Sequence, residues 1–257
     1  LRRAGRPHRK GALVALVHAV GAIHRGTAGP SSASIGSDDV TAALRRAARS
    51  KRVKAILFRV DSGGGSAVAS EAIWREVARA RERKKPVVVS MGNVAGSGGY
   101  YVACGADRIV ASPATLTGSI GVVWGKFVTR EAWRKVGVTW DALKVGEHAD
   151  LWSPAHDLGD AGWAKLEGHL DTIYEDFKAK VAAGRGMSPE QVEEVAKGRV
   201  WTGARAKDLR LVDALGGLRT ALDVVREVAG VPAGSPLRLR TFHPRRRRFP
   251  FGAGGEE

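Results

Sequence analysis

The chain has 257 residues, of which 44% are hydrophobic and 26% are charged, so it is long enough to bury a full core in one domain. It contains no run of 18 apolar residues that would cross a membrane, and its single cysteine, Cys104, excludes an internal disulfide. Because no CxxC, HExxH or clustered His/Asp motif is present, we expect no metal and no cofactor.

The net charge of +16 is concentrated at the two ends of the chain. Residues 1–10 carry five basic side chains, and residues 238–257 carry six arginines and two glutamates. The body has no basic stripe interleaved with aromatic residues, so we expect no nucleic-acid partner. We interpret 1–11 as a basic linker, 12–231 as the folded domain and 232–257 as a basic, disordered tail.

Strand and helix patterns alternate in the first half of the chain. Nearly continuous apolar runs predict buried strands at 13–20, 53–60 and 86–91. Helical spacing predicts helices at 38–50 and 67–85, and a Gly/Ser/Ala-rich loop is expected at 21–37. This alternation predicts an α/β fold with a largely parallel sheet.

The second half is more helical. Short strands are expected at 108–111, 118–123 and 138–145. Helices are expected at 127–136, 161–184, 188–197, 204–209 and 218–230. The helix near residue 188 has a clear start signal, because Ser188 is followed by Pro189 and, three residues after the serine, by Gln191.

Two glycine-rich turns each follow a predicted strand, at 62–66 and 96–99. The second turn holds Ser97, and a serine in a tight strand-to-helix turn can expose its hydroxyl beside free backbone N–H groups. If the two strands are neighbours in a parallel sheet, both turns lie at the same edge, where ligands bind. Their N–H groups would then converge as an oxyanion hole. The alternative is that both are ordinary βα turns without chemistry.

Five segments in this order resemble the S49 family of serine peptidases, known as signal peptide peptidase A or protease IV. The segments are FRVDSGGGS (58–66), GSGGYY (96–101), LTGSIGV (116–122), GRVWTG (198–203) and LVDALGG (211–217). The resemblance covers about residues 12–230. It implies a ClpP/crotonase-like fold of stacked ββα units with a helical C-terminal part, and a homo-oligomer.

The resemblance also implies a Ser/Lys dyad. Ser97 matches the nucleophile, Gly98 and Gly64 match the oxyanion-hole donors, and Ser119 matches a serine that hydrogen-bonds the catalytic lysine. The implied substrates are hydrophobic peptides, including cleaved signal peptides. The implied location is the bacterial cell envelope, membrane-associated through a segment outside this sequence, with the catalytic domain on the extracytoplasmic side.

One part of the family pattern is missing. Short members carry the lysine about 50 residues after the nucleophile, and Ala149 stands at that position here. We expect neither Lys144 nor His148 to replace it. Three explanations remain open: a paired N-terminal repeat of a longer chain supplies the lysine, the lysine has been mutated, or this is a non-catalytic relative that binds peptides or scaffolds an assembly. A crotonase-like acyl-CoA enzyme, without a serine nucleophile, is the rival class.

Overall fold

In a computed structural model of the protein, residues 11–29 and 34–242 are described. The main sheet has the strand order β10-β1-β4-β5-β6-β9, and all of these strands pair in parallel. Their bounds are Leu237–Thr241 (β10), Ala12–Val20 (β1), Val53–Ser62 (β4), Val87–Gly96 (β5), Arg108–Ala111 (β6) and Ala214–Leu215 (β9). The predicted α/β class with a parallel sheet is confirmed.

Two additional strands extend the sheet beyond the end of β5. β7 (Leu116–Gly118) pairs in parallel with β5, and β8 (Val200–Thr202) pairs antiparallel with β7. A separate two-stranded sheet consists of β2 (Ala22–His24) and β3 (Ser34–Gly36). The loop predicted at 21–37 therefore contains two short strands.

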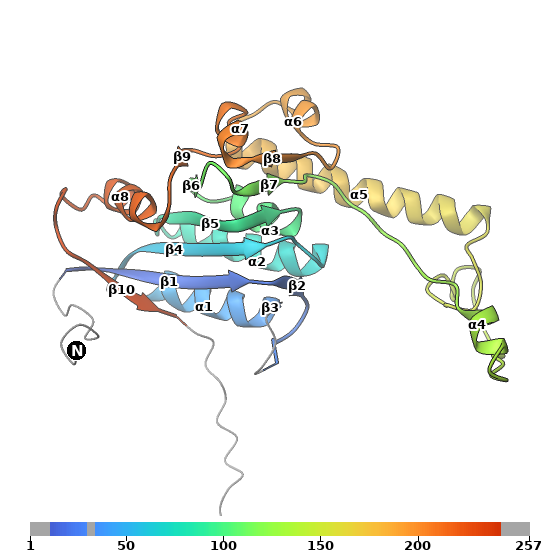
Figure 1. Ribbon diagram of the computed structural model, residues 1–257. Coiled ribbons are helices and arrows are strands. Elements are labelled where there is room, and N and C mark those ends of the chain that lie inside the picture. The colour runs from blue at the N-terminus through green and yellow to red at the C-terminus, as the bar shows by residue number, and fades with distance from the viewer. Residues whose placement is uncertain (1–10, 30–33, 243–257) are drawn as a thin grey trace, which may run out of the picture.

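The helices cover both faces of the sheet (Figure 1). Their bounds are Ser37–Arg49 (α1), Ala67–Glu82 (α2), Gly98–Cys104 (α3), Arg130–Arg134 (α4), Asp160–Arg185 (α5), Pro189–Val195 (α6), Gly203–Asp208 (α7) and Leu218–Val228 (α8). Successive strand residues point to opposite faces. Phe58 thus joins the large core under α1, α2 and α3, whereas Leu57 joins a smaller core under α8.

The predicted start of α6 is confirmed in atomic detail. The Gln191 N–H donates to Ser188 Oγ at 3.2 Å, and the Ser188 N–H donates to Gln191 Oε1 at 3.0 Å. This reciprocal pair satisfies two backbone donors at the helix N-terminus.

The prediction of disorder from residue 232 onward is wrong for 237–241, which form β10 at the outer edge of β1. Leu237 and Leu239 pack against the core under α8, and Phe242 joins the core on the opposite face. The unpaired edge of β1 supplies the hydrogen-bonding partner that the composition of the tail does not reveal. Residues 243–257 of the predicted tail, and residues 1–10 of the predicted linker, lie outside the described residues.

The predicted strand at 138–145 is also wrong, and the helix predicted at 127–136 is reduced to α4. Both stretches belong to residues 122–159, which we call the arm. Figure 1 shows the arm and the first half of α5 projecting away from the sheet. No sheet edge lies there to pair with an extended segment, so most of the large apolar side chains of the arm remain exposed. In the described part of the chain no helix has the length and apolarity needed to cross a membrane.

Candidate active site

Ser97 lies at the junction between β5 and α3. Its N–H donates to the Gly118 carbonyl at 2.9 Å, and its own carbonyl accepts from the Tyr101 N–H at 2.8 Å. Its φ of 51° is positive, which is uncommon for a residue with a side chain. Strained backbone of this kind is concentrated at functional sites, and a nucleophilic serine at a sharp strand-to-helix turn is one example.

The Ser97 hydroxyl is not used by the fold. Ser97 is the N-cap residue of α3, but its side chain makes no capping hydrogen bond. No partner for its Oγ is found among residues 11–29 and 34–242. The residue is half-buried and lines a cavity of about 570 Å³. The hydroxyl is therefore available to a ligand in this cavity.

The two glycine turns meet at this site, because β4 and β5 are neighbours. Gly64 has a φ of 105°, and a Cβ at this position would lie 2.7 Å from Gly98 N and 2.9 Å from Ser97 Cβ. Only glycine allows the two turns to approach so closely. The expectation that both turns lie at one sheet edge is thus confirmed.

The backbone N–H groups of the two glycine turns differ in whether they already donate to an acceptor within the protein. The Gly64 N–H donates to Ser62 Oγ at 3.1 Å, and that hydroxyl donates to the Gly21 carbonyl at 2.6 Å. Within the described ranges no acceptor is found for the N–H of Gly65 or of Gly98. A Cβ at Gly98 would lie 3.3 Å from Gly65 N, so these two amides belong to adjoining backbone. The sequence alone does not show whether the N–H of Gly64 or that of Gly65 is free to act as an oxyanion-hole donor.

Ser119 lines the same cavity as Ser97. Its N–H donates to the Arg199 carbonyl at 2.7 Å, which extends the pairing of β7 with β8, and its φ of 48° is also positive. The structure therefore brings Ser97, Gly98, Gly64 and Ser119 together, although they come from three different turns.

The first half of α5 forms a wall of the cavity that the sequence did not lead us to expect. This helix contributes Leu170, Glu167 and Asp171, and the start of the arm contributes Val122 and Val123. The cavity thus has an apolar side and two carboxylates. An amphipathic helix of this kind carries no motif, so only the three-dimensional arrangement could reveal its role.

No general base is in place beside Ser97 in the described part of the chain. Lys197 lines the cavity, but its side chain is 58% exposed and its Nζ lies 3.5 Å from Glu193 Oε1. Ala149 and His148 lie in a turn of the arm rather than in an extended segment. His148 lines a different cavity, where Lys144 Nζ pairs with Asp150 at 3.0 Å.

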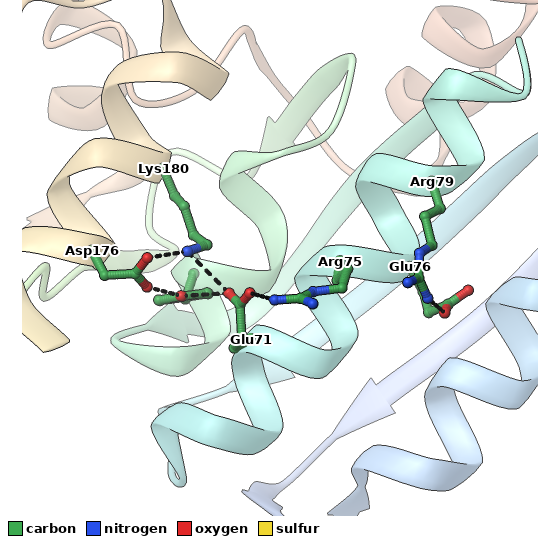
Figure 2. A network of polar contacts seen from close by, with 7 residues as sticks. Glu71, Arg75, Glu76, Arg79, Asp176 and Lys180 are labelled. Carbon is green, nitrogen blue, oxygen red and sulfur yellow. Dashed lines mark hydrogen bonds and ion pairs between the residues drawn. The ribbon is translucent and has the colours of Figure 1, made fainter.

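A polar network behind the nucleophile turn connects α2, α3 and α5 (Figure 2). The Tyr101 hydroxyl lies 2.8 Å from Glu71 Oε2 and 2.6 Å from Asp176 Oδ2. Lys180 pairs with both carboxylates, and Arg75 pairs with Glu71 at 2.7 Å. Tyr101 is in the first turn of α3, the helix that begins after Ser97. The network therefore holds α5, whose first half forms a wall of the cavity, against α3.

Two carboxylates and the tyrosine hydroxyl of this network have shifted pKa values. Burial opposes ionisation of Glu71, but hydrogen bonds from Arg75, Tyr101 and Lys180 outweigh it and lower its pKa. Burial likewise opposes ionisation of Asp176, and its bonds to Lys180 and Tyr101 lower the pKa overall. Burial, followed by the two carboxylates, raises the pKa of the Tyr101 hydroxyl, which stays protonated and donates.

Comparison with known proteins identifies the family. The model of peptidase family S49 matches residues 79–232. A chloroplastic serine protease SPPA from Arabidopsis thaliana is 38% identical over 230 residues, covering 88% of this chain and 34% of the relative. Protease 4 from Salmonella typhi is 40% identical over 223 residues, covering 87% and 36% respectively. The chain therefore spans about a third of the length of these relatives.

Among solved structures, a ClpP1 mutant from Listeria monocytogenes is similar, with a TM-score of 0.53 and 17% identity. The match covers 80% of this chain and 94% of that chain, and it confirms the predicted ClpP-like fold. The family match extends over more than half of the sequence and includes the Ser97 turn. On this evidence the chain belongs to peptidase family S49.

Proposed function

We propose that the chain is the nucleophile-bearing part of a serine peptidase, and that Ser97 attacks the peptide carbonyl. The observation that carries this proposal is the unused Ser97 hydroxyl, held in a strained turn at the wall of a cavity. As Oγ bonds to the carbonyl carbon, its proton passes to a base, and the same base returns a proton to the leaving amine. Water then hydrolyses the acyl-enzyme and regenerates the hydroxyl.

The negative charge that develops on the carbonyl oxygen needs hydrogen-bond donors. We assign this role to the N–H groups of Gly98 and Gly65, since neither has an acceptor among the residues that the structure describes. Gly64, which the family resemblance implies as a donor, instead provides the close approach of the two turns, because its N–H is bound to Ser62. One oxyanion-hole donor is typically worth about 3 kcal/mol of the barrier.

The base in this proposal is a lysine supplied from outside this stretch of chain. Ser119, at the same cavity, would accept a hydrogen bond from the lysine amine and orient it. The lysine must be neutral to accept the Ser97 proton, so burial in the completed site has to lower its pKa. The length of the relatives leaves ample room for a second segment to supply this group.

The apolar side of the cavity, formed by Val122, Val123 and Leu170, supports hydrophobic peptides as substrates. Following the family resemblance, we propose that these include cleaved signal peptides. We also propose that the whole protein forms a homo-oligomer and acts at the bacterial cell envelope. In this proposal its membrane contact lies outside this sequence and its catalytic part faces the extracytoplasmic side.

The proposal is tested by hydrolysis of a fluorogenic hydrophobic peptide. It is measured for this chain alone, for a longer protein that includes the segment proposed to supply the lysine, and for that longer protein with Ser97→Ala. We expect hydrolysis near background for this chain alone, robust hydrolysis by the longer protein, and complete loss with Ser97→Ala. A serine hydroxyl without a base is a weak nucleophile, which is why the wild-type chain alone should be slow.

Two results would favour another function. Hydrolysis that survives Ser97→Ala would exclude this serine as the nucleophile. Saturable binding of the peptide, with no hydrolysis in any variant, would favour a peptide-binding relative. This second candidate is retained because Ala149 stands at the position where short members of the family carry the lysine.

A further inference from the structure

A small cavity between α1 and α2 is rich in arginine. Its volume is about 180 Å³, which exceeds the space of several waters at about 30 Å³ each. Its lining includes four arginines and one carboxylate, which are Arg45, Arg49, Arg79, Arg83 and Glu76. Guanidinium groups are well suited to binding phosphates and carboxylates, so this cavity is suited to an anion.

The cavity lies at the opposite end of the strands from Ser97. α2 connects the parallel strands β4 and β5, so its last turn lies where β5 begins, whereas Ser97 follows the end of β5. α1 ends just before β4 begins, at the same edge, and packs with α2 on one face of the sheet (Figure 1). Lys85 Nζ joins the two helix ends, because it donates to the carbonyls of Val53 at 2.6 Å and Ser50 at 3.3 Å. A ligand bound here is therefore separate from the proposed peptidase chemistry.

A buried carboxylate holds two of the arginines in place. Glu76 Oε1 accepts from Arg45 Nη2 and from Arg79 Nη1, both at 2.7 Å, and the Glu76 side chain is 5% exposed. Figure 2 shows Glu76 and Arg79 on a different face of α2 from Glu71 and Arg75. Burial opposes ionisation of Glu76, but hydrogen bonds from the two arginines outweigh it and lower its pKa. Each guanidinium has five N–H donors, so donors remain for a ligand after the bond to Glu76 is made.

The other two arginines of the cavity have no ion-pair partner in the described ranges. Arg49 is the last residue of α1, Arg83 directly follows α2, and both are exposed. Glu76 is the one carboxylate among the described residues that line the cavity, and its ion pairs are with Arg45 and Arg79. The charges of Arg49 and Arg83 are therefore available to a ligand.

The charge of the cavity indicates which anion it fits. Four guanidinium groups against one carboxylate leave a net charge of +3. The C-terminal ends of α1 and α2 carry about −0.5 each, so together they offset about one of these charges and about +2 remains. A phosphate group carries about −1.5 to −2 at pH 7 and offers three oxygens, whereas a carboxylate carries a single charge and offers two. The cavity thus matches a phosphate group better than a carboxylate.

We propose that this cavity is a phosphate-binding site. Arg45 and Arg79, which Glu76 holds in place, supply preset hydrogen-bond donors. Arg49 and Arg83 supply the positive charge that Glu76 does not balance. The ligand is a terminal phosphate group, and it belongs either to a free phosphate in solution or to the headgroup of a phospholipid.

The experiment measures binding of inorganic phosphate to the purified chain by isothermal titration calorimetry at low ionic strength. The test variant, Arg49→Gln/Arg83→Gln, leaves both bonds to Glu76 in place. A second variant, Arg49→Lys/Arg83→Lys, keeps the charge but removes the planar guanidinium fork. We expect one phosphate per wild-type chain, binding at least about tenfold weaker in the glutamine variant, and an intermediate affinity in the lysine variant.

A matched control, Lys165→Gln/Arg219→Gln, removes two exposed cations elsewhere and should bind phosphate as the wild type does. Circular dichroism should show unchanged folding in every variant, since all the altered side chains are exposed. The control separates a defined site from general attraction of anions to a basic protein.

Vesicles distinguish the two sources of the phosphate group. Co-sedimentation is measured with vesicles of phosphatidylcholine alone and with vesicles that also contain phosphatidic acid. Sedimentation that requires phosphatidic acid and is lost in Arg49→Gln/Arg83→Gln would assign the site to a headgroup. Binding of inorganic phosphate without such sedimentation would assign it to a soluble ligand. The proposal is overturned if neither probe binds in a way that depends on Arg49 and Arg83, or if the control variant loses binding equally.

Discussion

The hydroxyl of a single residue, Ser62, holds the first glycine turn in place. It is buried and bonds to both Gly64 N–H and the Gly21 carbonyl. Ser62→Ala should lower the free energy of unfolding by about 1–3 kcal/mol, because two buried polar groups lose their partner. It should also slow labelling of Ser97 by a serine-reactive probe, since the turn beside the nucleophile loosens.

The matched control for this prediction is Ser90→Ala. Ser90 is a buried serine in the middle of β5, and its Oγ accepts from Arg59 at 2.9 Å. Urea unfolding should show destabilisation of similar size in both variants, with the labelling rate reduced only by Ser62→Ala. Equal labelling rates in the two variants would mean that Ser62 has no special influence on the site.

Cys104 gives a second prediction for a single residue. Burial raises the pKa of its thiol to about 12, and Sγ lies 3.2 Å from the Tyr101 carbonyl. The thiolate is the reactive form, so the native chain should react with Ellman's reagent only as fast as it unfolds. Rapid reaction of one thiol per native chain would show that the core around α3 is open.

The four site residues expected from the sequence were predictable to different degrees. Ser97, Gly98 and Ser119 lie in motifs, and parallel neighbouring strands bring such turns to one edge. The choice between the amides of Gly64 and Gly65 depends on the side-chain bond from Ser62, which a sequence pattern does not encode. The acidic wall from α5 was missed because Glu167 and Asp171 resemble ordinary solvated positions of an amphipathic helix.

At the scale of elements, the network joining α2, α3 and α5 makes the fold sensitive to acid. The folded-state pKa values of Glu71 and Asp176 lie below their ordinary values of 4.5 and 3.8. Their ionised forms therefore contribute stability above those values, and this contribution is lost as pH falls through the folded-state pKa values. Free energies of unfolding measured from neutral to acidic pH should decrease in that window.

Tyr101→Phe isolates the role of the network. Without the hydroxyl, the two carboxylates lose a donor, so the variant should be less stable at neutral pH by about 1–3 kcal/mol. The difference from wild type should shrink in acid, where the carboxylates are protonated. Tyr100→Phe is the control, because its hydroxyl donates to the Leu211 carbonyl at 2.9 Å and not to a carboxylate, so it should give a difference that changes little with pH. A difference for Tyr101→Phe that is constant with pH would contradict the account.

Whether a strand was predicted correctly from the sequence depended on whether a neighbouring strand is present to pair with it. Strands 53–60 and 86–91 were recognisable because both faces are buried, which requires continuous apolar sequence. Residues 138–145 have a similar apolar content, but they lie on the arm, where no sheet edge is within reach. Apolar composition cannot distinguish a strand that pairs within the chain from a segment that is exposed on its surface.

For the molecule as a whole, β10 shows that the folded domain does not end at residue 231. The Phe242 N–H donates to the Leu16 carbonyl at 2.9 Å, and the ring is buried in the core. A chain ending at 231 should lose about 3 kcal/mol or more of stability, since the burial of Leu237, Leu239 and Phe242 is removed. Thermal unfolding measures this loss directly.

The control is a chain ending at 242, which keeps β10 and should unfold at a higher temperature than the chain ending at 231. Equal stability of the chain ending at 231 would mean that β10 contributes nothing to the fold. The parallel α/β core was predictable from apolar periodicity, whereas this long-range pairing joins the two ends of the sequence and leaves no local signal.

The central claim is that the turn between β5 and α3 presents the Ser97 hydroxyl to the cavity beside free backbone N–H groups, and labelling with a peptidyl fluorophosphonate carrying hydrophobic side chains tests it most directly. Tandem mass spectrometry of the labelled chain locates the adduct. We predict a single adduct on Ser97, absent from Ser97→Ala and lost when the chain is unfolded. No adduct on Ser97, or labelling of Ser97 no faster than that of the exposed loop residue Ser112, would contradict the account.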